Sequence, residues 1–297
     1  MNLPGRALAV ALLAVAMLAA PMWGQPQSLI VSTGVGDGTY AAFFSQFSRV
    51  CTQPPLQGRP STGSIENLDR LLNNEANLAF VQADVLVTKL LIDHDLRVQS
   101  VRTFMLLYYE EIHILAKASN ASIANFSDLS NKKVGVYGGS TTTASALFTS
   151  TGIQPARLET FPGPTEAARA LGGEVDAVLG VGGKPLPWVA ALDSSYKLIA
   201  FDMFDKLSRI SKIYSQTTLG YPNLAKPPEV QTVAVPSLLI TMGYTAPAIV
   251  TPLLQLRTCI IKNLGVLRDT PGNHPKWRDV DPSIKGPWPY FEEPKSS

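Results

Sequence analysis

The chain has 297 residues, with 25 Lys and Arg against 23 Asp and Glu, and its formal net charge is +2. This balance excludes a strongly basic or acidic surface, and the sequence has no clustered basic stripe of the kind that nucleic-acid binders carry. A hydrophobic fraction of 45% with 16% charged residues excludes a disordered chain. The length suits two lobes of about 100–150 residues each.

The N-terminus has the pattern of an export signal. Arg6 precedes an uninterrupted apolar run of 13 residues, 8–20, which Pro21 ends. Such a run rises only about 20 Å as a helix, too little for a bilayer core of about 30 Å. We therefore expect residues 1–24 to be a cleaved signal peptide, with an uncleaved anchor as the alternative. Export would place the mature chain in an oxidising compartment.

The mature chain alternates predicted strands and helices, which indicates a mainly parallel α/β sheet with helices on both faces. The first unit has predicted strands at 29–32, 78–81, 104–108 and 112–116, and helices at about 40–50 and 65–73. A similar unit begins near residue 118, with predicted strands at 134–137, 158–161, 175–180 and 198–201 and helices at 126–129, from 140 onward, and at 166–171.

The last part of the chain contains an uncharged stretch, residues 230–256. Three prolines and recurring polar residues interrupt it, so it predicts a buried strand followed by a helix that begins near Pro247, where proline is tolerated in a first turn. The tail from Asp269 onward is rich in Pro, Lys and Trp, and we expect it to wrap irregularly over the surface.

Two glycine-containing loops, 34–39 and 138–141, each follow a predicted strand and open a predicted helix. Glycine lets the backbone approach a ligand closely, and a helix N-terminus attracts carboxylate or phosphate. The alternative is that both are ordinary turns with Ser or Thr caps. Thr39 occupies the place of the third glycine of a dinucleotide-binding loop, so that fingerprint is absent.

Several segments together resemble one known family over roughly residues 29–260. They are TGVGDGTY at 33–40, TGSIENL at 62–68, ANLAFVQADV at 76–85, YEEIHIL at 109–115, the Asp-Leu and Val-Gly-Val segments within 128–136, and Gly-Lys-Pro at 183–185. In this order they are similar to the TAXI family, the extracytoplasmic solute receptors of tripartite ATP-independent periplasmic (TRAP) transporters. Thr141 departs from the family, which usually has glycine after the serine of the second loop, and the proline-rich ending also differs.

The resemblance implies a type II periplasmic-binding-protein fold, with two lobes, a hinge and a ligand cleft between them. The implied first lobe comprises residues 25–116 and 231–297, and the second comprises residues 117–230. The segments that cross between the lobes are implied to be 111–116 and 231–240. The implied function is capture of a small organic anion, a carboxylate or an amino acid, in the periplasm by a monomer that delivers it to TRAP permease subunits in the membrane. The sequence shows no catalytic dyad and no metal-ligand spacing, so we expect no cofactor, metal or catalytic residue. The alternatives are a ligand-sensing receptor for a membrane kinase and a periplasmic enzyme on the same fold.

The residues expected to contact this anion lie on the two loops and on the elements between them. They are Gly38, Thr39, Tyr40, Ser64, Gln82, Ser140, Thr141 and Thr142. The two cysteines, Cys51 and Cys259, are far apart in sequence and are either a disulfide or two buried thiols. The family fold assigns both to helices of the first lobe, which implies a disulfide.

Other polar residues do not form an alternative site in the sequence. The three histidines, His94, His113 and His274, lack partners at metal-ligand spacing, and His113 is interpreted as structural. Glu110 and Glu111 are adjacent in a strand and point to opposite faces, so they are not a catalytic pair. Arg70 and Lys184 are interpreted as solvated residues, with ligand counter-charges as the alternative.

Overall fold

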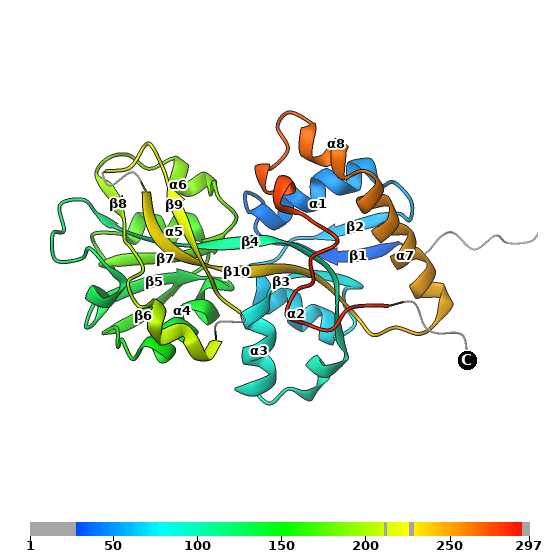
Figure 1. The fold of residues 1–297 in the computed structure, drawn as a ribbon, viewed down its shortest axis with the longest axis horizontal. Helices are drawn as coiled ribbons and strands as arrows, with labels where there is room; N and C mark the ends of the chain where they lie inside the picture. The colour runs from blue at the N-terminus through cyan, green and yellow to red at the C-terminus, as the bar shows by residue number, and fades with distance from the viewer. Residues whose placement is uncertain (1–27, 211–212, 226–228, 293–297) are drawn as a thin grey trace, which may run out of the picture.

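The computed structural model describes residues 28–210, 213–225 and 229–292. The expected signal peptide, residues 1–24, lies outside the described residues. Two α/β lobes lie side by side, and two long strands, β4 and β10, run through both of them (Figure 1). The expected type II periplasmic-binding-protein architecture is confirmed, and one sheet of ten strands links both lobes.

The first lobe is built around three short parallel strands. They are β1 (Leu29–Ser32), β2 (Leu56–Arg59) and β3 (Leu78–Gln82). Every residue of β3 is buried, as expected for an apolar strand of an α/β sheet with both faces covered. The helices of this lobe are α1 (Thr39–Val50), α2 (Ser64–Leu72), α3 (Ala83–Leu91), α7 (Pro247–Lys262) and α8 (Leu264–Asp269), and η1 (Leu96–Ser100) leads into β4.

The second lobe repeats the same construction. Its strands are β5 (Lys133–Tyr137), β6 (Arg157–Phe161) and β7 (Ala177–Gly182), with β8 (Tyr196–Leu198) and β9 (Ser215–Gly220) pairing to the crossing strands. Its helices are α4 (Ser140–Thr151), α5 (Pro164–Ala170) and α6 (Pro187–Ala190), with the short turns η2 (Phe126–Leu129) and η3 (Phe204–Ile210). Pro164 begins α5 and Pro187 begins α6, where the missing proline N–H is not required.

The two lobes are joined by β4 (Val101–Lys117) and β10 (Glu229–Met242), which pair with each other antiparallel. In the first lobe β10 pairs with β3, and in the second β4 pairs with β7, so the sheet order through the junction is β3-β10-β4-β7. The sequence predicted two separate strands at 104–108 and 112–116. That prediction is wrong, because Glu110 and Glu111 stay in the ladder opposite Val235 and Ala234.

The C-terminal tail is not confined to the surface. It forms η4 (Pro275–Asp279), in which Trp277 is fully buried against the first lobe. The Trp277 ring stacks on Phe43 of α1 with 4.1 Å between centroids, and its Nε1 donates to Gln46 Oε1 at 2.7 Å. The expectation of an irregular surface wrap is therefore corrected, because the indole supplies apolar area and a donor that α1 accepts.

The first lobe is also cross-linked. The structure joins Cys51, at the end of α1, to Cys259 in α7, with 5.9 Å between the Cα atoms. This bond ties a helix from the start of the chain to one from its end, so the two separate parts of the lobe form one unit.

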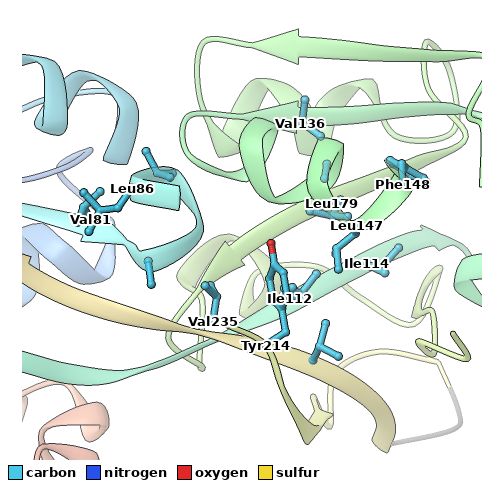
Figure 2. Packing of buried hydrophobic residues seen from close by; sticks show 14 of the residues in the cluster. Val81, Leu86, Ile112, Ile114, Val136, Leu147, Phe148, Leu179, Tyr214 and Val235 are labelled. Carbon is cyan, nitrogen blue, oxygen red and sulfur yellow. The ribbon is translucent and has the colours of Figure 1, made fainter. Parts of the chain in front are cut away.

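A hydrophobic cluster continues from one lobe into the other along the crossing strands. Figure 2 shows members of this cluster from both lobes and from the crossing strands: Val81, Leu86, Val235, Ile112 and Leu147. The lobes therefore share apolar packing next to the strands that join them.

Candidate functional site

A cleft lies between the lobes and encloses about 630 Å³ of space, counting its open mouth. Its walls come from the loop before α1, the start of α2, the end of β3, the crossing strand β4, and the loops that follow β5 and β7. The carboxyl ends of the parallel strands of both lobes meet here, where open α/β sheets bind their ligands.

The lobes touch across this cleft. Thr39 Oγ1 donates to the carbonyl of Gly183 at 3.4 Å. Gly139 of the second lobe lies so near the first that an added Cβ would come within 2.1 Å of Gln82 Oε1 and 2.9 Å of Ser64 Oγ. The structure is therefore the closed form of a two-lobe protein.

A buried polar contact holds the same closed form farther along the interface. Asp84, at the start of α3, accepts from Thr143 Oγ1 of α4 at 2.6 Å and from the Tyr214 hydroxyl at 2.7 Å. Asp84 is 2% exposed, and burial raises the pKa of its carboxyl. Asp84 Oδ1 has no hydrogen-bond partner among the described residues.

Six of the eight expected site residues line the cleft. They are Gly38, Thr39, Tyr40, Ser64, Gln82 and Ser140. Thr141 and Thr142 do not line it, and their N–H groups donate to the carbonyls of Gly138 and Gly139. Because helical residues turn by about 100° each, only the first residue of α4 faces the cleft in this turn.

Ser64 organises the polar part of the first-lobe wall. Its Oγ lies 3.3 Å from the Tyr40 hydroxyl and 3.3 Å from Gln82 Oε1, and it accepts from the Gln82 N–H at 3.2 Å. On the opposite wall, Ser140 Oγ accepts from the Val181 N–H at 3.0 Å, which leaves its own proton for a ligand acceptor.

Sequence reasoning missed the importance of Glu110. Its carboxyl lies on the cleft wall, is 2% exposed, and accepts from the Tyr108 hydroxyl at 3.3 Å. Burial raises its pKa to about 7, although hydrogen bonds from Tyr40 and Gln82 lower it. The signal was present in the sequence as two adjacent carboxylates, Glu110 and Glu111, inside a largely apolar strand.

The neighbouring Glu111 points the other way, as the strand alternation predicts. Its carboxylate lies 2.7 Å from Lys276 Nζ of the tail and accepts from the Lys184 N–H at 3.0 Å. Lys184 Nζ donates to the carbonyl of Thr218, and Arg70 Nη1 donates to that of Pro60. Neither cation lines the cleft, so neither is its counter-charge, and Arg70 is not simply solvated.

The described residues that line the cleft include no Lys, Arg or His. Its charged side chains are Glu110 and the exposed Asp37 at the mouth. Aromatic and aliphatic groups cover much of the second-lobe wall, where Trp188 Nε1 donates to the Tyr137 hydroxyl at 3.1 Å and Leu186 lies beside them. The cleft is therefore mildly acidic with an apolar side.

His113 is buried on the side of β4 away from the cleft. Its Nδ1 donates to the carbonyl of Glu111 at 2.9 Å, and its Nε2 accepts from the Tyr221 hydroxyl at 2.9 Å. The Tyr221 oxygen also accepts from the Leu186 N–H at 2.6 Å, so this network uses the neutral ring. Burial lowers the pKa of His113 to about 3, which supports a structural role.

Stability should therefore fall as the pH drops below about 6.5. The unfolded histidine takes up a proton there while the folded one does not, and each pH unit removes up to about 1.4 kcal/mol until the folded pKa is reached. Urea unfolding should show that the free energy of unfolding falls less between pH 7 and pH 4.5 in His113→Gln than in the parent. The control is His94→Gln, at an exposed position, which should lose as much as the parent. His274, whose pKa burial lowers to about 4, adds to the loss in all three proteins, and equal losses would contradict the assignment.

Within the described ranges, no helix is long and apolar enough to cross a membrane. Those residues also contain no group of three or more His, Cys, Asp or Glu arranged to hold a metal ion.

Comparison with known families decides the relationship of the chain. A model of the NMT1-like family matches residues 41–250, which is more than half of the 297 residues. The chain belongs to the NMT1-like family. The match spans the second glycine loop, the crossing strand β4 and all of β10, so the NMT1-like core contains most of the cleft wall, while the loop before α1 precedes the matched range.

Solved structures share the fold of this NMT1-like protein at low sequence identity. A protein from Bordetella bronchiseptica RB50 is 15% identical, with a TM-score of 0.53 over 86% of this chain and 76% of that one. An ancestral arginine-binding protein bound to arginine is 13% identical, with a TM-score of 0.52 over 81% of this chain and 93% of that one. A search of proteins with curated functions found no match.

Proposed function

We propose that the protein is an extracytoplasmic solute-binding protein that encloses a small carboxylate or amino acid between its lobes and delivers it to a TRAP-type membrane transporter. The observation that carries the proposal is the buried cleft whose walls come from both lobes, because such a site fills and empties only as the lobes move. The resemblance of the segments at 33–40, 62–68 and 76–85 to TAXI receptors supports the choice of transporter.

The ligand carboxylate is assigned to the starts of α1 and α4. Both helices have 12 residues and begin at the cleft, and their first N–H groups carry partial positive charge. The hydroxyls of Thr39 and Ser140 lie at these two starts. Ser64 and Ser140 contact no histidine among their described partners, which favours binding over catalysis.

The proposal also assigns the parts of the chain. Residues 1–24 direct export to the periplasm, residues 25–116 with 231–297 form the first lobe, and residues 117–230 form the second. In this proposal the protein binds its ligand as a monomer and uses no cofactor.

Protein purified from the periplasm should release a small carboxylate-containing molecule on denaturation, identified by mass spectrometry. Returning that molecule to the refolded, empty protein should lower the radius of gyration measured by small-angle scattering, because the lobes close on it. A protein that binds no released molecule, does not contract, or converts the molecule to a product would contradict the proposal.

A further inference from the structure

The charge of the cleft is unusual for a receptor of simple anions. Its one deeply buried charged group is the carboxyl of Glu110, and the described lining residues offer no cationic side chain to balance it. A buried carboxylate is costly without a partner of opposite charge. Its hydrogen-bond partner is the Tyr108 hydroxyl, and its neighbours on the cleft wall include Tyr40 and Gln82, which are also neutral.

Resting on the function proposed above, we infer that Glu110 selects ligands with a protonated amine, so that the ligand is a zwitterion such as an α-amino acid. The amine faces Glu110, the carboxylate faces the starts of α1 and α4, and the apolar body lies against Tyr137, Leu186 and Trp188. Of the two ligand classes in the function proposed above, this assignment selects the amino acid.

The position of Glu110 fits the short separation of the two charges in an amino acid. Tyr40, the second residue of α1, lines the cleft together with Glu110 and Gln82. Gln82 Oε1 lies at the backbone of Gly139, just before α4. The acid and both helix starts therefore border one cleft.

The rest of the cleft fits the remainder of such a ligand. Asp37 at the mouth adds a second negative charge on the entry path, which favours an approaching amine. The Tyr137 and Trp188 rings meet nearly edge to face, 6.3 Å apart, and form an apolar surface opposite the acidic strand. An apolar side chain of the ligand can pack against this surface.

The pH dependence of binding has opposite signs for the two ligand classes. An amine facing Glu110 stabilises its ionised form, so binding tightens as the pH rises from 6 to 8 through the pKa of about 7. A ligand carboxylate that faces Glu110 requires the protonated form of Glu110, so the affinity for such a ligand falls over the same pH range.

The other titratable groups around Glu110 do not change that sign. They are Tyr40 on α1, Tyr108 on β4, Tyr137 on β5 and Asp84 on α3. Burial raises the pKa of all three tyrosines above 10, so they stay neutral. Asp84 belongs to the contact with Thr143 and Tyr214, and comparison with Glu110→Gln separates any contribution from it.

The test uses calorimetry on the full mature protein with two matched sets of probes at pH 6, 7 and 8. One set is L-leucine, 4-methylpentanoate and 3-methylbutylamine, and the other is L-phenylalanine, 3-phenylpropanoate and 2-phenylethylamine. We expect an amino acid to bind, its deaminated acid to bind at least about tenfold more weakly, and the amino-acid affinity to rise with pH. The molecule released from the purified protein should carry an amine.

Glu110→Gln should lower amino-acid affinity at least about tenfold and remove its pH dependence, while the control Glu174→Gln, at an exposed site, leaves both unchanged.

The inference is overturned if the deaminated acids bind the parent as tightly as the amino acids, if affinity falls as the pH rises, or if the released molecule lacks an amine. Those results leave the solute-binding function intact. If neither the probes nor any released molecule binds, both proposals fail. The probe comparison on the parent does not depend on the folding of the variant.

Discussion

Gly139→Leu is expected to lower ligand affinity at least about a hundredfold while leaving each lobe folded. In the closed form, a Cβ at this position would overlap Gln82 Oε1 and Ser64 Oγ of the other lobe. The backbone of Gly139 is in the right-handed helical region, at φ −61° and ψ −23°, so the second lobe itself tolerates a side chain there. The substitution therefore removes the binding-competent closed state, and apparent affinity falls with its population.

The measurement is calorimetry with the molecule released from the parent protein, combined with small-angle scattering. Gly36→Leu is the matched control, because Gly36 is exposed and an added Cβ there has no atom within 4 Å. The control should bind within about twofold of the parent and contract normally. A Gly139→Leu protein that binds and contracts like the parent would show that the lobes need not meet at this point.

Lys276→Met should lower the free energy of unfolding by about 3–5 kcal/mol. Lys276 Nζ lies 2.7 Å from Glu111 Oε1, and the side chains are 7% and 4% exposed. Methionine keeps most of the volume but leaves the Glu111 carboxylate buried without its main partner, since Lys184 Nζ is 3.8 Å away and 41% exposed. Guanidinium unfolding at pH 7 measures the loss.

Two further variants test the electrostatic origin of that loss. Lys262→Met, at an exposed position in α7, should change stability by no more than about 0.5 kcal/mol. Adding Glu111→Gln to Lys276→Met should restore part of the lost stability, because the buried charge is then gone. A Lys276→Met protein within about 1 kcal/mol of the parent would mean that the pair contributes only packing.

The sequence was sufficient to place the cleft because the relevant signals are local. The apolar run of β3 and the glycine loops after β1 and β5 identify strand ends, and parallel strands bring those ends together. The positions of Ser64 and Gln82 on the cleft follow from the same pattern. These features depend on the order of the elements rather than on fine details of packing.

The sequence is less informative where the outcome depends on register or on distant partners. Thr141 and Thr142 do not line the cleft because α4 begins at Ser140, and a shift of one residue rotates a helical side chain by about 100°. The orientation of Glu110 depends on how β4 pairs with β10, more than 100 residues later. Trp277 becomes a core residue only because α1 offers Phe43 and Gln46.

The crossing strands also determine how the protein pivots. Where β4 and β10 pass between the lobes, Pro236 lies opposite Tyr109 and has no N–H to give to the ladder, and register shifts follow at residues 237–240. The junction is thus a paired ribbon, a form of sheet that tolerates a range of twist. In the described part of this junction the chain is already ordered as paired strands, so little chain entropy is lost there when the lobes meet, and more of the contact energy is retained as affinity.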